Sequence, residues 1–296
     1  MSIVKSLSVG DGDMFYITHG SDNFTIIDCC LSEWDKVRIV KELKSQSADK
    51  GIIRFISTHP DDDHIRGLAY LHQEMSLLNF YCVKNGAAKS DETDDFYQYC
   101  ELRDDPKKSF YLSKGCSRKW MNLSDEERGS AGINICWPIT SNEQFKEALQ
   151  AAANGESPNN ICPIIKYTLT GGASILWMGD LETEFMESVK DEIKVGHVDI
   201  IFAPHHGRDS GTVPAEWLEE IDAKLIVIGE ADSEHLNYYD GYNTLTQNSA
   251  GDITLECETG QTNIYVSNDD YHVDFLEDEL LHDTYGTYIG TLKVNT

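Results

Sequence analysis

The chain has 296 residues, with 24 lysines and arginines against 51 aspartates and glutamates, which gives a formal net charge of −27. This length accommodates one large α/β domain or two small ones, and 40% hydrophobic residues is too apolar for a disordered chain. The acidic balance argues against a broad basic groove that pairs with phosphates. A nucleic-acid substrate would therefore require metal ions, a local basic patch or a protein partner.

No apolar run approaches the roughly 20 residues that span a bilayer, and the N-terminus has no apolar stretch typical of a signal peptide. The eight cysteines are scattered and contain no C-x-x-C pair. Such a scatter is typical of reduced thiols. We therefore expect a cytoplasmic protein with no membrane partner.

The first part of the chain alternates strand and helix patterns. In chain order it predicts strands over residues 3–7, 14–18, 24–27 and 52–56, with a helix over residues 34–43 before the last strand. Strand, helix and strand in succession indicate an α/β fold.

The next part, residues 85–130, is polar and irregular, which predicts an insertion or a lid within one domain of residues 1–296. Regular patterns then resume. They predict strands over residues 133–137, 163–169, 173–178, 198–202 and 225–228, and helices over residues 142–153 and 182–190. The last 40 residues are expected to form short strands.

Four potential metal ligands fall within six residues, directly after the buried strand over residues 52–56. They are His59, Asp61, Asp63 and His64. Imidazole and carboxylate together suit Zn²⁺, Mn²⁺ or Fe. The alternative is an acidic turn in which Asp63 caps a helix that starts near Ile65, but such a turn does not need two histidines.

Two further buried strands end in residues of the same kind. Asp180 follows the strand over residues 173–178, with Gly179 leaving room for close approach, and His205 and His206 follow the strand over residues 198–202. A Gly-Asp or a His-His pair alone is weak evidence. Three strands that each deliver His or Asp at the carboxyl end are what a metal site at a sheet edge requires.

The order His-x-Asp-x-Asp-His, Gly-Asp and His-His-Gly resembles the metallo-β-lactamase superfamily, and within it the hydrolase domain of the ComEC competence proteins, which are bacterial DNA-uptake channels. The sequence Val-Gly-Asp-Gly-Asp at residues 9–13, Asp28 and residues 159–163 are similar to further motifs of that branch. Two residues differ from the pattern of that branch: Arg66 stands where the relatives have Gly, and Arg208 stands where they have Ser. The transmembrane channel has no counterpart here, so we expect a stand-alone relative, and a role in DNA uptake does not follow from the resemblance.

The resemblance implies an αββα four-layer sandwich that binds two divalent metal ions, with zinc or manganese expected. Mapped by position, it assigns His59 and Asp61 to the first metal, Asp63, His64 and His205 to the second, and Asp180 as the bridge. Asp63 is also expected to orient the attacking water. His206 would stabilise charge on the leaving oxygen or a phosphate, or would only donate a supporting hydrogen bond.

Four more residues are candidates for contact with the substrate. His235 follows the strand over residues 225–228 and would reach the substrate or a metal, and Asn160 and Arg208 would bind a ligand at the site. Lys119 belongs to a basic stretch with interleaved aromatic residues, at positions 107–120. That stretch is either a solvated part of the insertion or a contact for phosphate or a single strand over the metal cleft.

The leading hypothesis is a metal-dependent phosphodiesterase or nuclease that uses a metal-activated water, because two cations can clamp the attacking and leaving oxygens. A short or single-stranded substrate suits the net charge better than a duplex. The same metals also support ester, thioester or lactam hydrolysis, and the fold alone does not decide. A third hypothesis is a non-catalytic or partner-activated effector with a protein partner. The retention of all six expected ligands argues against this hypothesis.

Overall fold

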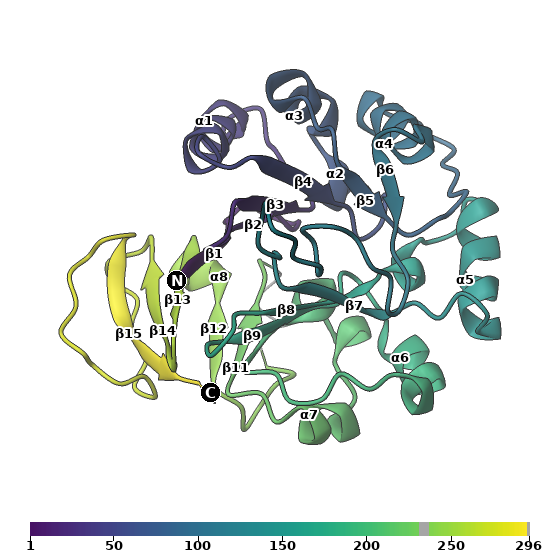
Figure 1. Ribbon diagram of the computed structural model, residues 1–296. Coiled ribbons are helices and arrows are strands. Elements are labelled where there is room, and N and C mark those ends of the chain that lie inside the picture. Colours follow the sequence, from purple (N-terminus) through teal and green to yellow (C-terminus); the bar gives the residue numbers. More distant parts are fainter. Residues whose placement is uncertain (231–236, 295–296) are drawn as a thin grey trace.

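Two β-sheets lie face to face, and helices cover the outer face of each (Figure 1). This computed structural model describes residues 1–230 and 237–294. Within those ranges the first sheet has nine strands in the order β15-β14-β13-β1-β2-β3-β4-β5-β6, and the second has six in the order β12-β11-β10-β9-β8-β7. The layers run helix, sheet, sheet, helix, which confirms the predicted αββα sandwich of the α/β class.

The bounds of the elements follow the chain. The strands of the first sheet are β1 (Ser2–Ser6), β2 (Phe15–Thr18), β3 (Asn23–Ile27), β4 (Ile52–Ile56), β5 (Phe80–Cys82), β6 (Ser109–Tyr111), β13 (Ile253–Glu258), β14 (Gln261–Val266) and β15 (Thr287–Lys293). Those of the second are β7 (Ile133–Trp137), β8 (Ile164–Thr168), β9 (Ser174–Trp177), β10 (Ile200–Phe202), β11 (Leu225–Ile228) and β12 (Thr244–Thr246). The α-helices are α1 (Lys36–Gln46), α2 (Asp62–Ile65), α3 (Leu68–Met75), α4 (Asp94–Asp104), α5 (Glu143–Ala153), α6 (Thr183–Val189), α7 (Ala215–Ile221) and α8 (Gln247–Ala250).

Helices α1, α3 and α4 lie over the first sheet, and α5, α6 and α7 lie over the second (Figure 1). None of these helices, nor any other in the described ranges, has the length and apolar character needed to cross a membrane.

Each sheet combines antiparallel strands with a run of parallel strands. The run is β3 to β6 in the first sheet and β9 to β12 in the second. Parallel strands bring their carboxyl ends to one edge of a sheet, which is where ligands bind in open α/β sheets. The segments that follow β4, β9 and β10 carry the residues described below.

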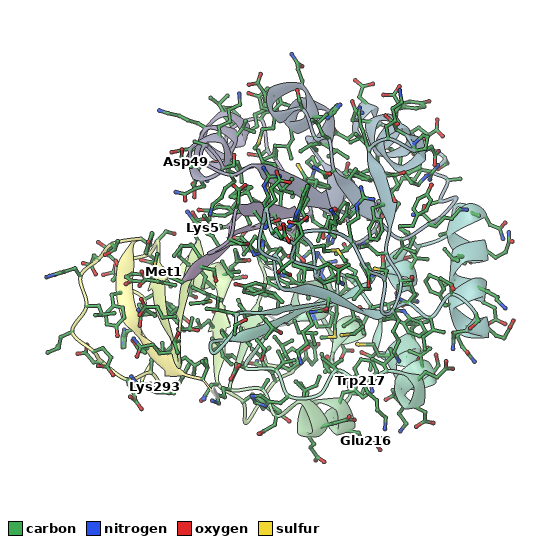
Figure 2. All side chains as sticks on the ribbon, viewed as in Figure 1. Met1, Lys5, Asp49, Glu216, Trp217 and Lys293 are labelled. Carbon is green, nitrogen blue, oxygen red and sulfur yellow. The ribbon has the colours of Figure 1, made fainter. Side chains whose placement is uncertain are left out.

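The largest apolar cluster fills the space between the two sheets and continues between the second sheet and helices α5, α6 and α7 (Figure 2). Within it, the ring centroid of Phe202 lies 4.8 Å from that of Phe15 and 5.1 Å from that of Trp177. Burial of such large rings contributes strongly to the packing of the two sheets. The contact joins β2 in the first sheet to β9 and β10 in the second, so it fixes the strand ends that carry the polar residues.

The segment of residues 85–130 is more regular than its composition predicts. It contains α4 and also β6, which extends the first sheet beside β5. The Thr93 side chain accepts a hydrogen bond from Phe96 N, and Asp94 and Asp95 occupy the first turn of α4, where carboxylates stabilise a helix. The expected irregular structure is therefore wrong for α4 and β6, where the acidic run begins a helix. That the segment is an insertion or a lid stays a prediction. The division into a single domain stays a prediction.

Candidate metal centre

Four side chains form a tight cluster where the two sheets meet. Asp63, His64, Asp180 and His206 each offer one ligand atom, and these atoms all lie within 4.8 Å of one another. Asp63 and His64 lie on α2, directly after β4, whereas Asp180 follows β9 and His206 lies in a 3-10 turn after β10. The three strand ends that the sequence singles out therefore converge. Asp63 does not cap a helix, because α2 begins one residue before it.

The buried Asp180 carboxylate is the centre of this arrangement. Its Oδ1 lies 3.0 Å from His64 Nε2. Its Oδ2 lies 3.9 Å from His59 Nε2, 3.8 Å from His205 Nε2 and 3.7 Å from His206 Nε2. Four imidazoles thus present the same ring nitrogen to one carboxylate, although His59 and His205 lie just outside the four-residue cluster.

All four imidazoles are held through the other ring nitrogen, Nδ1, and at His206 the partner is Asp13 Oδ1, at 3.2 Å. Thr58 Oγ1 lies 3.1 Å from Nδ1 of His59, and Asp28 Oδ2 lies 2.9 Å from Nδ1 of His64. Ser210 Oγ lies 2.9 Å from Nδ1 of His205. Histidines that bind metals are oriented in this way, with a hydrogen bond at one nitrogen and the metal at the other.

Several buried atoms at the centre lack hydrogen-bond partners among the described residues. They are His59 Nε2, His64 Nε2 and Asp180 Oδ1. The last two are close together, but their contact does not have the geometry of a hydrogen bond. Buried polar atoms without partners are costly, and imidazole nitrogen with carboxylate oxygen is the donor set of Zn²⁺ or Mn²⁺. The residues present therefore fit a divalent metal.

His206 belongs to the four-residue cluster, whereas His205, which the sequence predicts as a metal ligand, lies just outside it. His206 Nε2 lies 3.3 Å from Asp63 Oδ2, and its Nδ1 lies 3.2 Å from Asp13 Oδ1. Both histidines have left-handed backbone, with φ of 52° and 55°. That conformation is uncommon outside glycine and is concentrated at functional sites. It turns two consecutive side chains toward Asp180.

The charges at the centre are strongly coupled. Burial, together with the nearby His64, lowers the pKa of His59 to about 4, so this imidazole is neutral at pH 7. Burial also opposes charge on His64, but the carboxylate of Asp180 raises its pKa well above the usual value. Burial is likewise overcome at His206, where Asp13 and Asp180 raise the pKa to about 10. In return, His64 and His206 hold the pKa of the buried Asp180 well below its usual range.

Two glycines allow segments of the backbone to pack closely against their neighbours at the metal centre. A Cβ on Gly179, whose φ is +52°, would lie 2.7 Å from Cys162 Sγ and 2.9 Å from Thr58 Cβ. A Cβ on Gly12 would lie 2.5 Å from the backbone oxygen of Asp63. Both positions therefore require glycine, the first so that Asp180 can follow β9 directly into the cluster.

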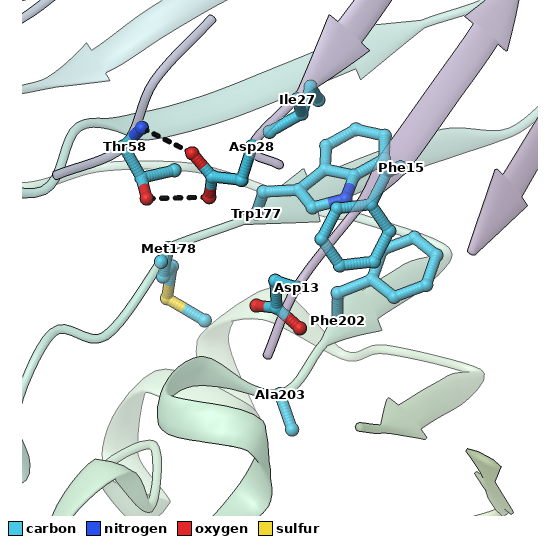
Figure 3. Close-up of a pocket in the computed structure, with 10 residues that line it drawn as sticks. Asp13, Phe15, Ile27, Asp28, Thr58, Trp177, Met178, Phe202 and Ala203 are labelled. Atoms are coloured by element: carbon cyan, nitrogen blue, oxygen red, sulfur yellow. Dashed lines mark hydrogen bonds between the residues drawn. The ribbon is translucent and has the colours of Figure 1, made fainter. Parts of the chain in front are cut away.

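A small cavity lies beside the cluster, with polar and apolar walls (Figure 3). On one side Asp28 Oδ1 and Oδ2 accept hydrogen bonds of 2.8 and 2.7 Å from Thr58 N and Oγ1, drawn as dashed lines. On the other side are the rings of Phe15, Trp177 and Phe202. The apolar wall lowers the local dielectric, which strengthens the electrostatic interactions of the polar residues.

Asp61 and Arg208 lie near the cluster but make other contacts. Asp61 Oδ1 accepts a hydrogen bond of 2.8 Å from Lys89 Nζ, and its Oδ2 lies 3.8 Å from His59 Nε2. Asp61 is therefore close to His59 without belonging to the four-residue group. Arg208 follows the His-His-Gly turn and its guanidinium lies 3.8 Å from Asp11 Oδ1.

Two other predicted residues, Asn160 and Lys119, are not brought to the cluster. The side-chain amide of Asn160 is bound to Glu182. Asn160 Nδ2 donates to the Glu182 carboxylate at 2.8 Å, and the backbone N of Glu182 donates to Asn160 Oδ1 at 3.1 Å. Lys119 lies with Ile52 at the amino end of β4, because the connection between β6 and β7 returns to that edge. His235 lies outside the described residues.

The structure adds residues to which the sequence assigns no role, namely Asp13, Asp28, Thr58 and Lys89. Asp28 follows β3 just as His59 follows β4, so the same strand-end argument could have identified it. Asp13 belongs to a motif of the resemblance, but its contact with His206 joins residues 193 positions apart. No pattern in the sequence indicates Lys89.

Comparison with known proteins gives structural likenesses at low sequence identity. No family model matches the sequence, and no curated protein matches it significantly. Two similar solved structures are the metallo-beta-lactamase fold protein YhfI from Bacillus subtilis and Igni18, a metallo hydrolase from the archaeon Ignicoccus hospitalis. YhfI is 12% identical, with coverage of 83% of this chain and 96% of that chain and a TM-score of 0.44. Igni18 is 12% identical, with coverage of 86% and 99% and a TM-score of 0.48.

Proposed function

We propose that this protein is a metal-dependent hydrolase that cleaves phosphodiesters with a metal-activated water. The observation that carries the proposal is the buried Asp180 carboxylate facing four imidazole nitrogens. Within residues 1–230 and 237–294, His59 Nε2, His64 Nε2 and Asp180 Oδ1 have no hydrogen-bond partner. A structural ion pair needs one imidazole per carboxylate. Four imidazoles around one carboxylate suit a cation.

The residues of the chain have distinct roles in this proposal. His59, His64, His206 and Asp180 hold the metal, and Asp28 and Thr58 fix two of the imidazoles in the tautomer that leaves Nε2 free. Bound divalent ions would supply a nucleophilic hydroxide at neutral pH and polarise the bond under attack. Asp63 is partly exposed, and its pKa is held well below its usual range because the hydrogen bond from His206 outweighs burial. It therefore stays ionised and can orient a water through a hydrogen bond.

Two basic side chains beside the cluster, Lys89 and Arg208, each facing an aspartate, favour an anionic substrate over a neutral ester or lactam. Lys89 and Asp61 line a hollow of about 170 Å³ next to the metal centre, together with Ser157. Lys89 donates to Asp61, and Arg208 extends from the turn that carries His206. An ammonium and a guanidinium are the groups that bind phosphate oxygens. The net charge of −27 disfavours long polyanions, so the proposed substrate is a short or single-stranded phosphodiester.

Cleavage assays test this function directly. Single-stranded DNA, duplex DNA, RNA and bis(4-nitrophenyl) phosphate would each be incubated with Mn²⁺, Zn²⁺ or Mg²⁺. We expect metal-stimulated cleavage that is lost in Asp63→Ala and retained in Asp62→Ala. Asp62 is the matched control, because it is adjacent on α2 but pairs with the exposed Arg66 at 2.7 Å.

Two outcomes would redirect the proposal. Hydrolysis of 4-nitrophenyl acetate or a thioester, without cleavage of any phosphodiester, would favour the alternative hydrolase. Silence on every substrate, with metal bound at full stoichiometry, would favour a partner-activated or non-catalytic component.

A further inference from the structure

A second cavity, of about 430 Å³, lies at the amino ends of β4 and β5. Ile52 begins β4 and Asn79 directly precedes β5, and both line the cavity. The metal centre follows the carboxyl end of β4, and five residues of strand span roughly 17 Å. The cavity is therefore separate from the metal centre, and its volume is that of a small-molecule site.

The cavity is basic in a strongly acidic protein. Arg118 and Lys119 line it, and none of its lining residues in the described part of the chain is acidic. Lys119 Nζ lies 3.1 Å from Asp125, but Arg118 forms no ion pair with any described residue. The guanidinium of Arg118 lies 5.1 Å from the ring centroid of Phe110. Its fork of N–H donors is thus positioned by stacking and free to bind an anion.

A buried positive charge beside this cavity has no counter-ion in the described part of the chain. Arg54 is fully buried, and its guanidinium donates to Asn23 Oδ1, Thr25 Oγ1 and the backbone oxygen of Trp120, all neutral. Its Nε has no hydrogen-bond partner among residues 1–230 and 237–294. A buried charge without compensation is costly. Arg54 also lies 5.8 Å from the ring of Tyr81, so two of its contacts, Tyr81 and Trp120, line the cavity.

The aromatic wall of the cavity is held in an unusual conformation. Trp120 has a φ of 64°, in the left-handed region that bulky residues rarely adopt and that is concentrated at ligand sites. Its indole Nε1 donates to Asp125 Oδ1 at 3.1 Å, and the guanidinium of Arg128 lies 4.9 Å from its ring centroid. The ring is therefore fixed at the cavity rather than packed into the core.

We propose that this cavity binds a nucleotide, with the phosphate at Arg118 and Lys119 and the base against Trp120. The phosphate supplies the negative charge that Arg54 lacks, and the base supplies a flat apolar surface for the aromatic wall. This second site does not rest on the proposed hydrolase activity. It is a binding site at the opposite end of the first sheet.

Isothermal titration calorimetry with the four ribonucleoside 5′-monophosphates tests this site. It would be run on the protein as isolated and after treatment with EDTA. We expect at least one nucleotide to bind under both conditions, and its nucleoside and inorganic phosphate each to bind at least ten-fold more weakly. We expect Arg118→Gln and Trp120→Phe each to weaken binding at least ten-fold, and Lys146→Gln, an exposed change on α5, to leave it unchanged.

Several results would overturn the proposal. No nucleotide binding at millimolar concentration would exclude the site. Equal binding of inorganic phosphate would show a simple anion patch. Binding that disappears with EDTA or in Asp180→Asn, but persists in Arg118→Gln, would place the nucleotide at the metal centre. Because nucleotide binding is also measured on metal-free protein, a missing hydrolase activity would not change the conclusion about this cavity.

Discussion

The two ends of β4 bury charge in opposite ways. At the carboxyl end, Asp180 is surrounded by imidazoles, and Asp28 lies behind His64. Toward the amino end, the guanidinium of Arg54, the middle residue of β4, is buried among neutral oxygens. An excess of buried ligand atoms indicates a cation, and a buried cation without a counter-ion indicates an anion. The net charge of the chain therefore does not predict the ligand at either end of β4.

Loss of the central carboxylate is expected to have the largest effect. Asp180→Asn removes the carboxylate that faces four imidazoles, so we expect metal-stimulated cleavage to fall by about 10³-fold or more. Metal stoichiometry, measured by atomic absorption, should fall with it. Binding at the amino end of β4 should not change, which keeps the two ends distinct.

Asp199→Asn is the matched control for this variant. Asp199 is equally buried and accepts hydrogen bonds from Ser174 N and Oγ, both at 2.9 Å, at the start of β9. We expect a lower melting temperature but unchanged metal content. If both variants lose metal equally, Asp180 acts only through folding and the metal centre is not supported.

The stability of the metal-free protein should depend on pH in a way that shows whether the His206 imidazole is charged. Because Asp13 and Asp180 raise the pKa of His206 to about 10 against burial, the folded state keeps a proton that the unfolded state loses near pH 6.5. This stabilisation is complete below pH 6.5 and is lost as the pH rises toward 10. The free energy of unfolding should fall by up to about 1.4 kcal/mol per pH unit in that range.

Urea unfolding in EDTA at pH 7 and pH 9 measures this change. His206→Gln should show a flatter dependence, whereas His272→Gln, an exposed change, should match the wild type. An unchanged slope in His206→Gln would mean that His206 is neutral in the metal-free protein.

Substitution of Asp28, which lies behind His64, should have a smaller effect on metal binding. Asp28→Asn removes the carboxylate at His64 Nδ1, so we expect metal affinity to fall by about 10- to 100-fold. The backbone of Asp28 is left-handed, with a φ of 57°, and asparagine tolerates that conformation. Competition with a chelating dye measures the affinity. Asp35→Asn at the start of α1 is the control, and equal affinity in both variants would remove Asp28 from the site.

The sequence predicts the carboxyl end of β4 better than the amino end. Strand patterns locate β4, β9 and β10, and the residues that follow each strand are then expected to meet. The choice between His205 and His206 depends on two left-handed residues, which no periodicity indicates. Lys119 is near α4 and β6 in sequence, but the direction in which the chain leaves β6 decides which end of the sheet it reaches.

The smallest expected effect concerns Lys89, and it decides between substrate classes. Lys89→Met keeps the apolar stem and removes the charge beside Asp61. For an anionic phosphodiester we expect KM to rise about ten-fold with a smaller change in kcat, because a charged hydrogen bond contributes roughly 1.5 kcal/mol or more. For a neutral ester KM should not change, and Lys41→Met, on the exposed face of α1, should affect neither substrate. Equal KM values for the phosphodiester in Lys89→Met and wild type would mean that Lys89 serves only Asp61, and the case for an anionic substrate would lose its main support.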